Sequence, residues 1–281
     1  MTSIHVGVIA WRQLEAGCVY ALWQLARSGA DVKLDIHGGD ALVERARSTL
    51  ATRFLRDTTA DVLLTIDSDI VFDPQQALQI AEQAHELKAI VAGVYSTRSW
   101  AQAAPASMLN DTPIEFGTDP TPVPIRWAAN GFMAVDRSVL ERLRDEDPEM
   151  ALCHTNQGRL FEFYPFYHTR YATDDQNARI LLSEDFAFCE AAWELGIPTY
   201  INPAVRLGHI GAQVFRLEHM AWKEPPPMPM RLTRQGLRYA VEADAPPALV
   251  PFVKGAPTTE IVHLNRAARR REERARQPVG V

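Results

Sequence analysis

Hydrophobic residues in the first hundred positions fall in short runs separated by amphipathic stretches. The apolar runs at residues 4–10, 62–66 and 89–95 are too short for buried helices and suit strands covered on both faces. Residues 32–36 alternate like a further strand. Helices are predicted at residues 14–27, 41–56 and 74–87. This alternation of strands and helices predicts right-handed crossovers and a mostly parallel sheet.

The pattern changes after residue 100. A strand is predicted at residues 125–135, interrupted by Asn130-Gly131, and a glycine inside a strand often marks a bulge or the close approach of a ligand. A long loop at residues 145–180 carries several aromatic rings, which form either a small core under the loop or, for one or two rings, a stacking surface for a sugar. The remaining predicted elements are a helix that Asp136 caps and that runs through Leu143, a helix at 183–195, and a strand at 197–201. Asn202-Pro203 then turns the chain into residues 205–211.

These elements predict an α/β fold with a Rossmann-like, mostly parallel sheet flanked by helices over residues 1–215. Residues 1–100 form a nucleotide-binding type of half and residues 101–215 a second half. Residues 216–281 are predicted to be an irregular extension with a Pro-rich connector. The first strand is followed by neither a Gly-x-Gly-x-x-Gly pattern nor a P-loop, which argues against dinucleotide binding and against an ATP-binding phosphate loop.

Composition adds limits on location and partners. The chain has 281 residues and a net charge of −6, so it has no general attraction for nucleic acid. No stretch is long and apolar enough to span a membrane, the N-terminus lacks a secretory signal, and the three cysteines have no metal-type spacing. A cytoplasmic protein with reduced thiols is therefore expected. Residues 266–276 carry six arginines and two glutamates, which predicts a solvated end or a weak contact with an anionic surface.

Candidate chemistry begins at Asp67-Ser68-Asp69, directly after the most apolar strand. Ligands of open α/β sheets bind at the carboxyl ends of the strands. Two carboxylates at this spacing can hold Mg²⁺ or Mn²⁺ and, through the ion, a diphosphate. The alternative is structural: Asp67 ends the strand and Asp69 forms a turn.

Two further segments carry polar groups. Glu184 and Asp185 open a predicted helix, a place where the helix dipole alone favours acidic residues. His209 lies between two glycines, which suits a ligand or a turn more than a packed core.

The order of these motifs resembles that of GT-A type glycosyltransferases, in particular family 2. The resemblance covers roughly residues 4–215 and rests on Asp67-Ser68-Asp69, Ser183-Glu184-Asp185, Arg206-Leu207-Gly208-His209 and the segment that starts at Asn130-Gly131. It implies a GT-A type fold in which residues 101–215 supply the acceptor and metal half. The sequence departs from the family 2 pattern at the first strand, which ends in Ala10-Trp11, and at the second, which has Asp35-Ile36-His37 instead of paired aspartates.

The resemblance also implies roles. Asp67, Asp69 and His209 would bind Mn²⁺ or Mg²⁺, and Asp185 would be the general base with Glu184 beside it. Residues implied in donor binding are Ala10, Trp11, Asp35, Arg47, Asp67, Ser68 and Gly131. Arg45 and Arg53 are further candidates for the diphosphate, or all three of these arginines are solvated helix charges.

The expected function is therefore metal-dependent transfer of a sugar from a nucleotide-sugar donor to a hydroxyl acceptor, with a glycan as one candidate acceptor. Inversion is favoured because Asp185 matches the position of a base. Two alternatives stay open: a sugar nucleotidyltransferase, and a non-catalytic subunit that binds sugar nucleotides. The nucleotidyltransferase would need a basic, glycine-rich loop after the first strand, where Ala10-Trp11-Arg12-Gln13 stands.

Overall fold

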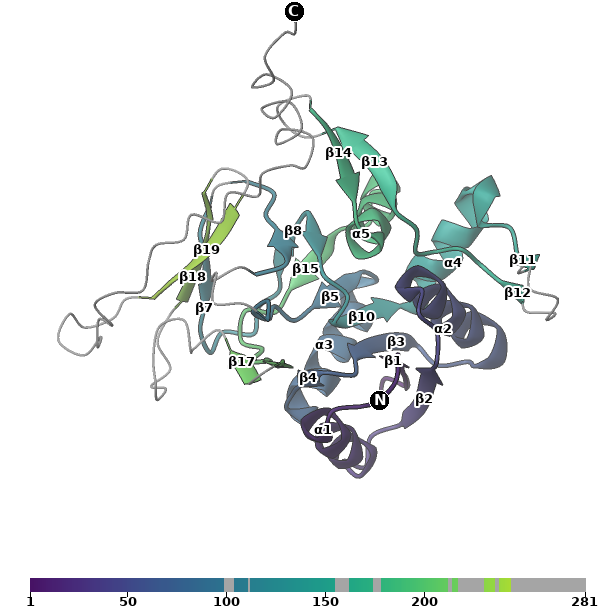
Figure 1. The fold of residues 1–281 in the computed structure, drawn as a ribbon, viewed down its shortest axis with the longest axis horizontal. Coiled ribbons are helices and arrows are strands. Elements are labelled where there is room, and N and C mark those ends of the chain that lie inside the picture. The colour runs from purple at the N-terminus through teal and green to yellow at the C-terminus, as the bar shows by residue number, and fades with distance from the viewer. Residues whose placement is uncertain are drawn as a thin grey trace, which may run out of the picture. The chain divides into compact units, whose positions relative to one another are not determined.

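A computed structural model describes residues 1–98, 104–110, 112–154, 162–173, 178–211 and 214–216, together with the backbone of two later strands. The first part of the chain alternates strand and helix as predicted (Figure 1). Its elements are β1 (Ile4–Ala10), α1 (Ala16–Ala26), β2 (Val32–Gly38), α2 (Val43–Asp57), β3 (Val62–Asp67), β4 (Ile70–Val71), α3 (Pro74–Leu87) and β5 (Ile90–Ala92).

The second part has shorter strands. They are β6 (Ala106–Ser107), β7 (Ile114–Phe116), β8 (Val123–Ile125), β9 (Trp127–Ala128), β10 (Phe132–Asp136), β11 (Cys153–His154), β12 (Glu162–Phe163), β13 (Arg170–Thr173), β14 (Arg179–Leu182), β15 (Thr199–Ile201), β16 (Gly208–Ile210), β17 (Val214–Arg216), β18 (Met230–Gln235) and β19 (Arg238–Ala243). Its helices are α4 (Arg137–Glu146), the 3₁₀ turn η1 (Pro148–Met150) and α5 (Glu184–Glu194).

Seven strands form the central sheet in the order β2-β1-β3-β10-β5-β15-β8. Strands β2, β1 and β3 pair in parallel, and β15 is parallel to β5. Strand β10 runs antiparallel to both of its neighbours, and β8 runs antiparallel to β15. The predicted α/β class with a mostly parallel, Rossmann-like sheet is confirmed.

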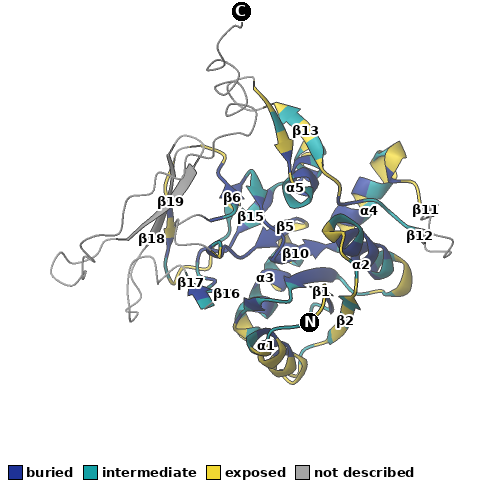
Figure 2. Cartoon of the chain, viewed as in Figure 1, coloured by how far each residue is buried: buried dark blue, intermediate teal, exposed yellow. Residues whose placement is uncertain are grey.

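Helices cover both faces of this sheet, so the fold has three layers. Helices α1 and α3 pack on one face around Val6, Leu64 and Ile66. Helices α2, α4 and α5 pack on the other, where Phe54 and Leu63 are fully buried. The central strands are buried along their length, whereas the edge strand β2 and the outer side of α1 are exposed (Figure 2). Complete burial of one such side chain contributes about 1.5–3 kcal/mol, which makes the central strands the stable platform of the site.

Several predicted elements take a different form. The strand predicted at residues 125–135 is divided into β8, β9 and β10, because its parts pair with different partners: β8 with β15, β9 with β6, and β10 with β3 and β5. The predicted loop at 145–180 contains the hairpin of β13 and β14. Its rings at Phe166 and Tyr167 are buried in the core below α5, whereas Tyr171 is 62% exposed.

The C-terminal extension lies largely outside the described residues, and so does the basic stretch at 266–276, whose predicted contact with an anionic surface stays a prediction. Within the extension, β18 pairs with β7 and with β19. In the described part of the chain, no helix combines the length and the apolarity needed to cross a membrane. The thiols of Cys18 and Cys189 are buried and free.

Candidate active site at the carboxyl end of β3

The side chains of β3 alternate between the two faces of the sheet, and this alternation sets the direction of Asp67 at the end of the strand. Leu63 faces the core under α2, whereas Leu64 and Ile66 face α1 and α3. Because side chains alternate along a strand, Asp67 lies on the α2 side of the sheet. The residue stands where β3 ends, so its side chain is 31% exposed despite the buried strand before it.

The antiparallel strand β10 brings a second segment to the same place. Phe132 pairs with Ile66, and the backbone N–H of Asp67 donates a hydrogen bond to the carbonyl of Gly131 at 2.9 Å. The Asn130-Gly131 interruption seen in the sequence therefore lies directly beside the end of β3.

Arg47 of α2 connects three segments that are far apart in the sequence. Its Nη2 lies 3.1 Å from Oδ1 of Asp67, its Nη1 donates to the carbonyl of Asn130 at 2.7 Å, and its Nε lies 3.3 Å from Oε1 of Glu184. The residue is only 4% exposed. A guanidinium can hold several acceptors at once because its donors are fixed in one plane. Arg47 thereby fixes β3, the Asn130-Gly131 turn and the start of α5 to one another.

The carboxylates around Arg47 have perturbed pKa values. Desolvation is the main cause that raises the pKa of Asp67, with Asp69 and Asp185 adding to the rise and Arg47 opposing it. Desolvation likewise raises the pKa of Glu184, again with Asp185 adding and Arg47 opposing. Clusters of carboxylates with shifted pKa values are frequent at functional sites. Arg47 is the cation that opposes both rises and so favours the ionised form of both acids.

Asp69 and His209 form the other side of the site. Strand β16 pairs with β4 so that His209 stands opposite Ile70, and the N–H of Ile210 donates to the carbonyl of Asp69 at 2.8 Å. His209 Nδ1 lies 2.9 Å from the carbonyl of Ser96, which fixes the proton on that nitrogen. Its Nε2 is directed at Asp69, with 3.4 Å between Nε2 and Oδ2.

Asp69 is arranged to stay ionised. Burial disfavours its charge, but the hydrogen bond and charge of His209 and the charge of Arg98 outweigh burial and lower its pKa. Arg98 Nη1 lies 2.9 Å from Oδ2 of Asp69. A carboxylate and an oriented imidazole are a donor pair that suits a divalent cation. The described residues contain no group of three or more His, Cys, Asp or Glu side chains placed to hold a metal. Asp67 pairs with Arg47.

Asp185 and Glu184 differ in what they contact. Glu184 points inward to Arg47, whereas Oδ1 of Asp185 accepts hydrogen bonds from the Ser183 hydroxyl and, at 2.8 Å, from the Phe186 N–H. Among the described residues, Oδ2 of Asp185 has no hydrogen-bond partner. Of the two acids, Asp185 is therefore the one with an oxygen available to a bound molecule.

Gly131 is required by the ring of Tyr95. A Cβ atom added at Gly131 would lie 2.5 Å from the Tyr95 hydroxyl and 2.7 Å from its Cζ. The Tyr95 ring is 7% exposed and packs edge-on against His209 with 5.1 Å between ring centroids. Burial and the charge of Asp67 raise the pKa of Tyr95, so its hydroxyl stays neutral.

Gly131→Ala should destabilise the protein by about 1–3 kcal/mol, the usual cost of forcing extra volume into a packed interior. Urea denaturation would measure this change. Gly117→Ala is the matched control, because a Cβ atom there would have no neighbour within 4 Å. Equal stability of the two variants would show that Tyr95 does not need the space at Gly131.

The remaining predicted donor-binding residues differ in whether they lie beside the site. Ala10 and Ser68 lie beside the site: Ile9 pairs with Asp67, and the Ser68 carbonyl accepts a hydrogen bond from the Glu15 N–H at 2.9 Å. Trp11 follows β1 and is 50% exposed. Asp35, in contrast, lies within β2, three residues before its end, with Oδ1 at 3.0 Å from Arg53 Nη1. The structure does not bring Asp35 into the cluster.

The three arginines of α2 that the sequence offered as diphosphate candidates also separate. Only Arg47 reaches the cluster, whereas Arg45 pairs with Asp40 at 2.7 Å and Arg53 pairs with Asp35. Tyr95 and Arg98 were not singled out in the sequence, and both belong to the site. The signal that could have found them is their position three and six residues after the end of β5, a strand that ends at the same edge of the sheet.

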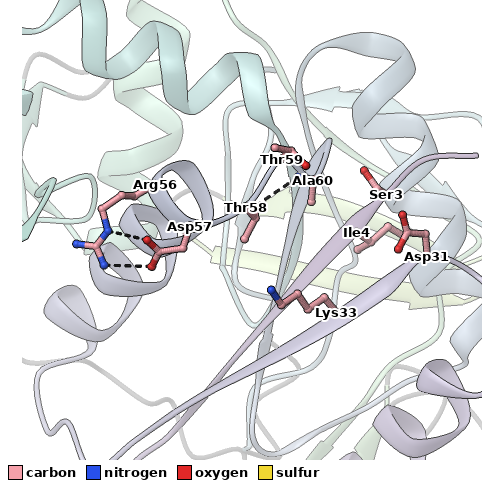
Figure 3. Close-up of a pocket in the computed structure, with 9 residues that line it drawn as sticks. All are labelled: Ser3, Ile4, Asp31, Lys33, Arg56, Asp57, Thr58, Thr59 and Ala60. Atoms are coloured by element: carbon pink, nitrogen blue, oxygen red, sulfur yellow. Dashed lines mark hydrogen bonds and ion pairs between the residues drawn. The ribbon is translucent and has the colours of Figure 1, made fainter.

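A separate hollow lies elsewhere on the molecule. It has a volume of about 460 Å³ and is lined by residues such as Ser3, Asp31, Lys33 and Thr58 (Figure 3). These residues lie at the amino ends of β1, β2 and β3, the opposite edge of the sheet from Asp67. The hollow is therefore not part of the candidate site.

Comparisons with known proteins give distant structural likenesses. The protein A197 from STIV matches with 14% identity and a TM-score of 0.46, over 87% of this chain and 96% of that one. TarS from S. aureus, in complex with UDP-GlcNAc, matches with 11% identity and a TM-score of 0.37, over 73% of this chain and 57% of that one. A 4-diphosphocytidyl-2C-methyl-D-erythritol synthase from Anaerococcus prevotii matches with 10% identity and a TM-score of 0.31, over 68% and 96%.

No protein-family model and no curated protein sequence matches the chain. At these identities and TM-scores, the likenesses do not indicate an activity. The chemistry of the site is the basis for a functional proposal.

Proposed function

We propose that the protein is a glycosyltransferase that moves a sugar from a nucleotide-sugar donor to a hydroxyl acceptor with the help of a divalent cation. One observation carries the proposal: three segments distant in sequence bring Asp67, the Asp69–His209 pair and the Glu184-Asp185 pair to the carboxyl end of β3. This edge is where open α/β sheets bind their ligands.

Asp69 and His209 would hold Mn²⁺ or Mg²⁺, and Asp67 would contribute a further oxygen only by turning away from Arg47. The fit rests on the 3.4 Å approach of His209 Nε2 to Asp69 Oδ2 and on the Nδ1 contact with Ser96, which leaves Nε2, once deprotonated, as the donor nitrogen. When bound, such a cation neutralises the charge that develops on a leaving diphosphate.

Asp185 would act as the general base for the acceptor hydroxyl. The Ser183 hydroxyl and the Phe186 N–H orient its carboxylate through Oδ1 and leave Oδ2 to receive a proton. Glu184 is held by Arg47 and would position the start of α5. A base opposite the leaving group favours inversion of the transferred sugar, which NMR of the product would establish.

Asp185→Asn should lower turnover by roughly 10²-fold or more while leaving donor affinity nearly unchanged, because a lost general base affects the chemical step. Turnover and calorimetric donor binding would be measured on the same preparations. Glu194→Gln is the matched control, since Glu194 ends the same helix and pairs with Arg170 on the surface. Equal losses of donor affinity and of rate in Asp185→Asn would contradict the assigned role.

The donor and the competing activities can be screened together. Nucleotide sugars, UDP-GlcNAc among them, should raise the melting temperature more with Mn²⁺ than without it, because ligands of the folded state stabilise it. Release of pyrophosphate from NTP and sugar phosphate would identify a nucleotidyltransferase instead. Donor turnover that survives both Asp69→Ala and Asp185→Asn would favour a binding subunit with a contaminating activity.

A further inference from the structure

The edge of the central sheet at β2 is open. Among the described residues, β2 pairs only with β1, so the backbone groups on its outer side lack strand partners. The strand is seven residues long and contains no proline. Leu34 is 37% exposed and Ile36 is 50% exposed. An open strand edge of this length is a template for pairing with another strand.

Leu34 and Ile36 belong to one face of this edge. Asp35 and His37 contact Arg53 of α2, so the alternating residues Leu34 and Ile36 face the other side of the sheet, where α1 packs. The apolar surface continues onto α1. Val19 is 47% exposed and Trp23 is 53% exposed.

The orientation of α1 turns these two side chains away from β4. A Cβ atom at Gly17 would lie 2.8 Å from Val71 of β4, so the Gly17 side of the helix faces β4. At 100° per residue, Val19 and Trp23 lie about 160° and 120° around the helix from Gly17. They therefore point away from β4, and the same helix also contacts β2. We call Val19, Trp23, Leu34 and Ile36 the edge patch.

We propose that the edge patch is a self-association surface, on which a second copy of this chain pairs its β2 antiparallel to the first. The two-fold axis passes through Leu34. In this register Val32 stands opposite the partner's Ile36, and Lys33 stands opposite the partner's Asp35. The strand sequence Val32-Lys33-Leu34-Asp35-Ile36 is thus self-complementary in both hydrophobicity and charge.

The neighbouring registers lack this complementarity. A two-fold axis at Asp35 would place two carboxylates opposite each other, and an axis at Lys33 would do the same with two ammonium groups. An axis at Ile36 would place Leu34 opposite a glycine, Gly38. Like charges directly opposite each other destabilise strand pairs, so charge excludes the axes at Lys33 and Asp35, and the lost apolar contact of Leu34 disfavours the axis at Ile36.

Sedimentation of the full chain over a range of concentrations tests the proposal. The expected result is a reversible dimer that Leu34→Lys converts to a monomer, because two ammonium groups then meet on the axis. Leu181→Lys is the control: Leu181 lies on the β13–β14 hairpin and is 61% exposed. A chain that is monomeric at every concentration overturns the proposal, whether the edge stays open or another segment of the chain covers it.

Two further variants test the register and guard against a folding defect of Leu34→Lys. Lys33→Glu should weaken the dimer at least tenfold in dissociation constant, whereas Lys33→Arg should leave it intact. Under oxidation, Leu34→Cys should form a disulfide between copies in much higher yield than Lys33→Cys, since only residue 34 faces itself. A dimer that is lost in Leu181→Lys, or that is indifferent to Lys33→Glu, would overturn the pairing.

Discussion

Replacing Asp69 with alanine should abolish both cation-dependent donor binding and turnover. Asp69 is the carboxylate that faces His209 Nε2 at 3.4 Å, and its lowered pKa keeps it charged at neutral pH. Without it, the imidazole remains as the single oriented donor on that side of the site. We expect donor affinity in Mn²⁺ to fall at least to the level that the unaltered protein shows in EDTA.

Calorimetry with and without Mn²⁺ measures this effect directly. Asp57→Ala provides the matched control, because Asp57 is a half-exposed carboxylate that pairs with Arg56 at the opposite edge of the sheet. Donor binding in Asp69→Ala that still responds to Mn²⁺ would place the cation elsewhere. His209→Gln should reduce Mn²⁺ affinity without abolishing it, because Asp69 keeps its charge.

Replacing Arg47 with methionine should have the largest effect on stability. The change removes a buried cation and leaves Asp67 and Glu184 without their shared partner. Breaking a buried ion pair by removing one partner typically costs about 3–5 kcal/mol. Methionine approximates the volume of the aliphatic part of arginine, so most of the loss reports the uncompensated carboxylates and not a cavity. Chemical denaturation at pH 7 would measure the loss.

The loss in Arg47→Met should depend on pH with a defined sign. Asp67 and Glu184 already have folded-state pKa values above their ordinary ones, so each destabilises the fold as pH rises from the ordinary value through the raised one. Without Arg47 both pKa values rise further. The destabilisation should therefore be largest near neutral pH and should shrink as acid protonates both groups.

Arg45→Met is the control for this measurement. Arg45 lies on the same helix and pairs with Asp40 near the surface, so its loss should cost about 1 kcal/mol or less. A similar destabilisation in both variants would show that Arg47 does not hold the acid cluster together.

The individual strands and helices of the first hundred residues could be predicted because their patterns are local. Residues 4–10 and 74–87 match β1 and α3 at both ends. The partners of β10 could not be predicted in this way. Its five residues are all buried and read as a strand, but nothing in their alternation says that they lie between β3 and β5. Pairing partners depend on the whole sheet, which a local pattern does not contain.

The same limit applies to the site. The motif at Asp67-Ser68-Asp69 predicted the carboxylates at the end of β3, because strand ends are visible in the sequence. The buried hydrogen bond of Arg47 to the Asn130 carbonyl and the contact of Arg98 with Asp69 both depend on tertiary packing. Asp35 was placed at the donor by the resemblance alone. In the structure, the Asp35 carboxylate contacts Arg53 and His5, which lie on other elements of the fold.

The position of β10 has a consequence for how the chain acquires its structure. Strands β3 and β5 meet only through a strand that is synthesised some forty residues after β5 ends. Until those residues leave the ribosome, one edge of β3, the most hydrophobic strand, has no strand partner. An unpaired edge of this kind is a surface that chaperones bind and that nucleates aggregation. A premature stop before residue 132 should therefore yield insoluble product instead of a smaller folded unit.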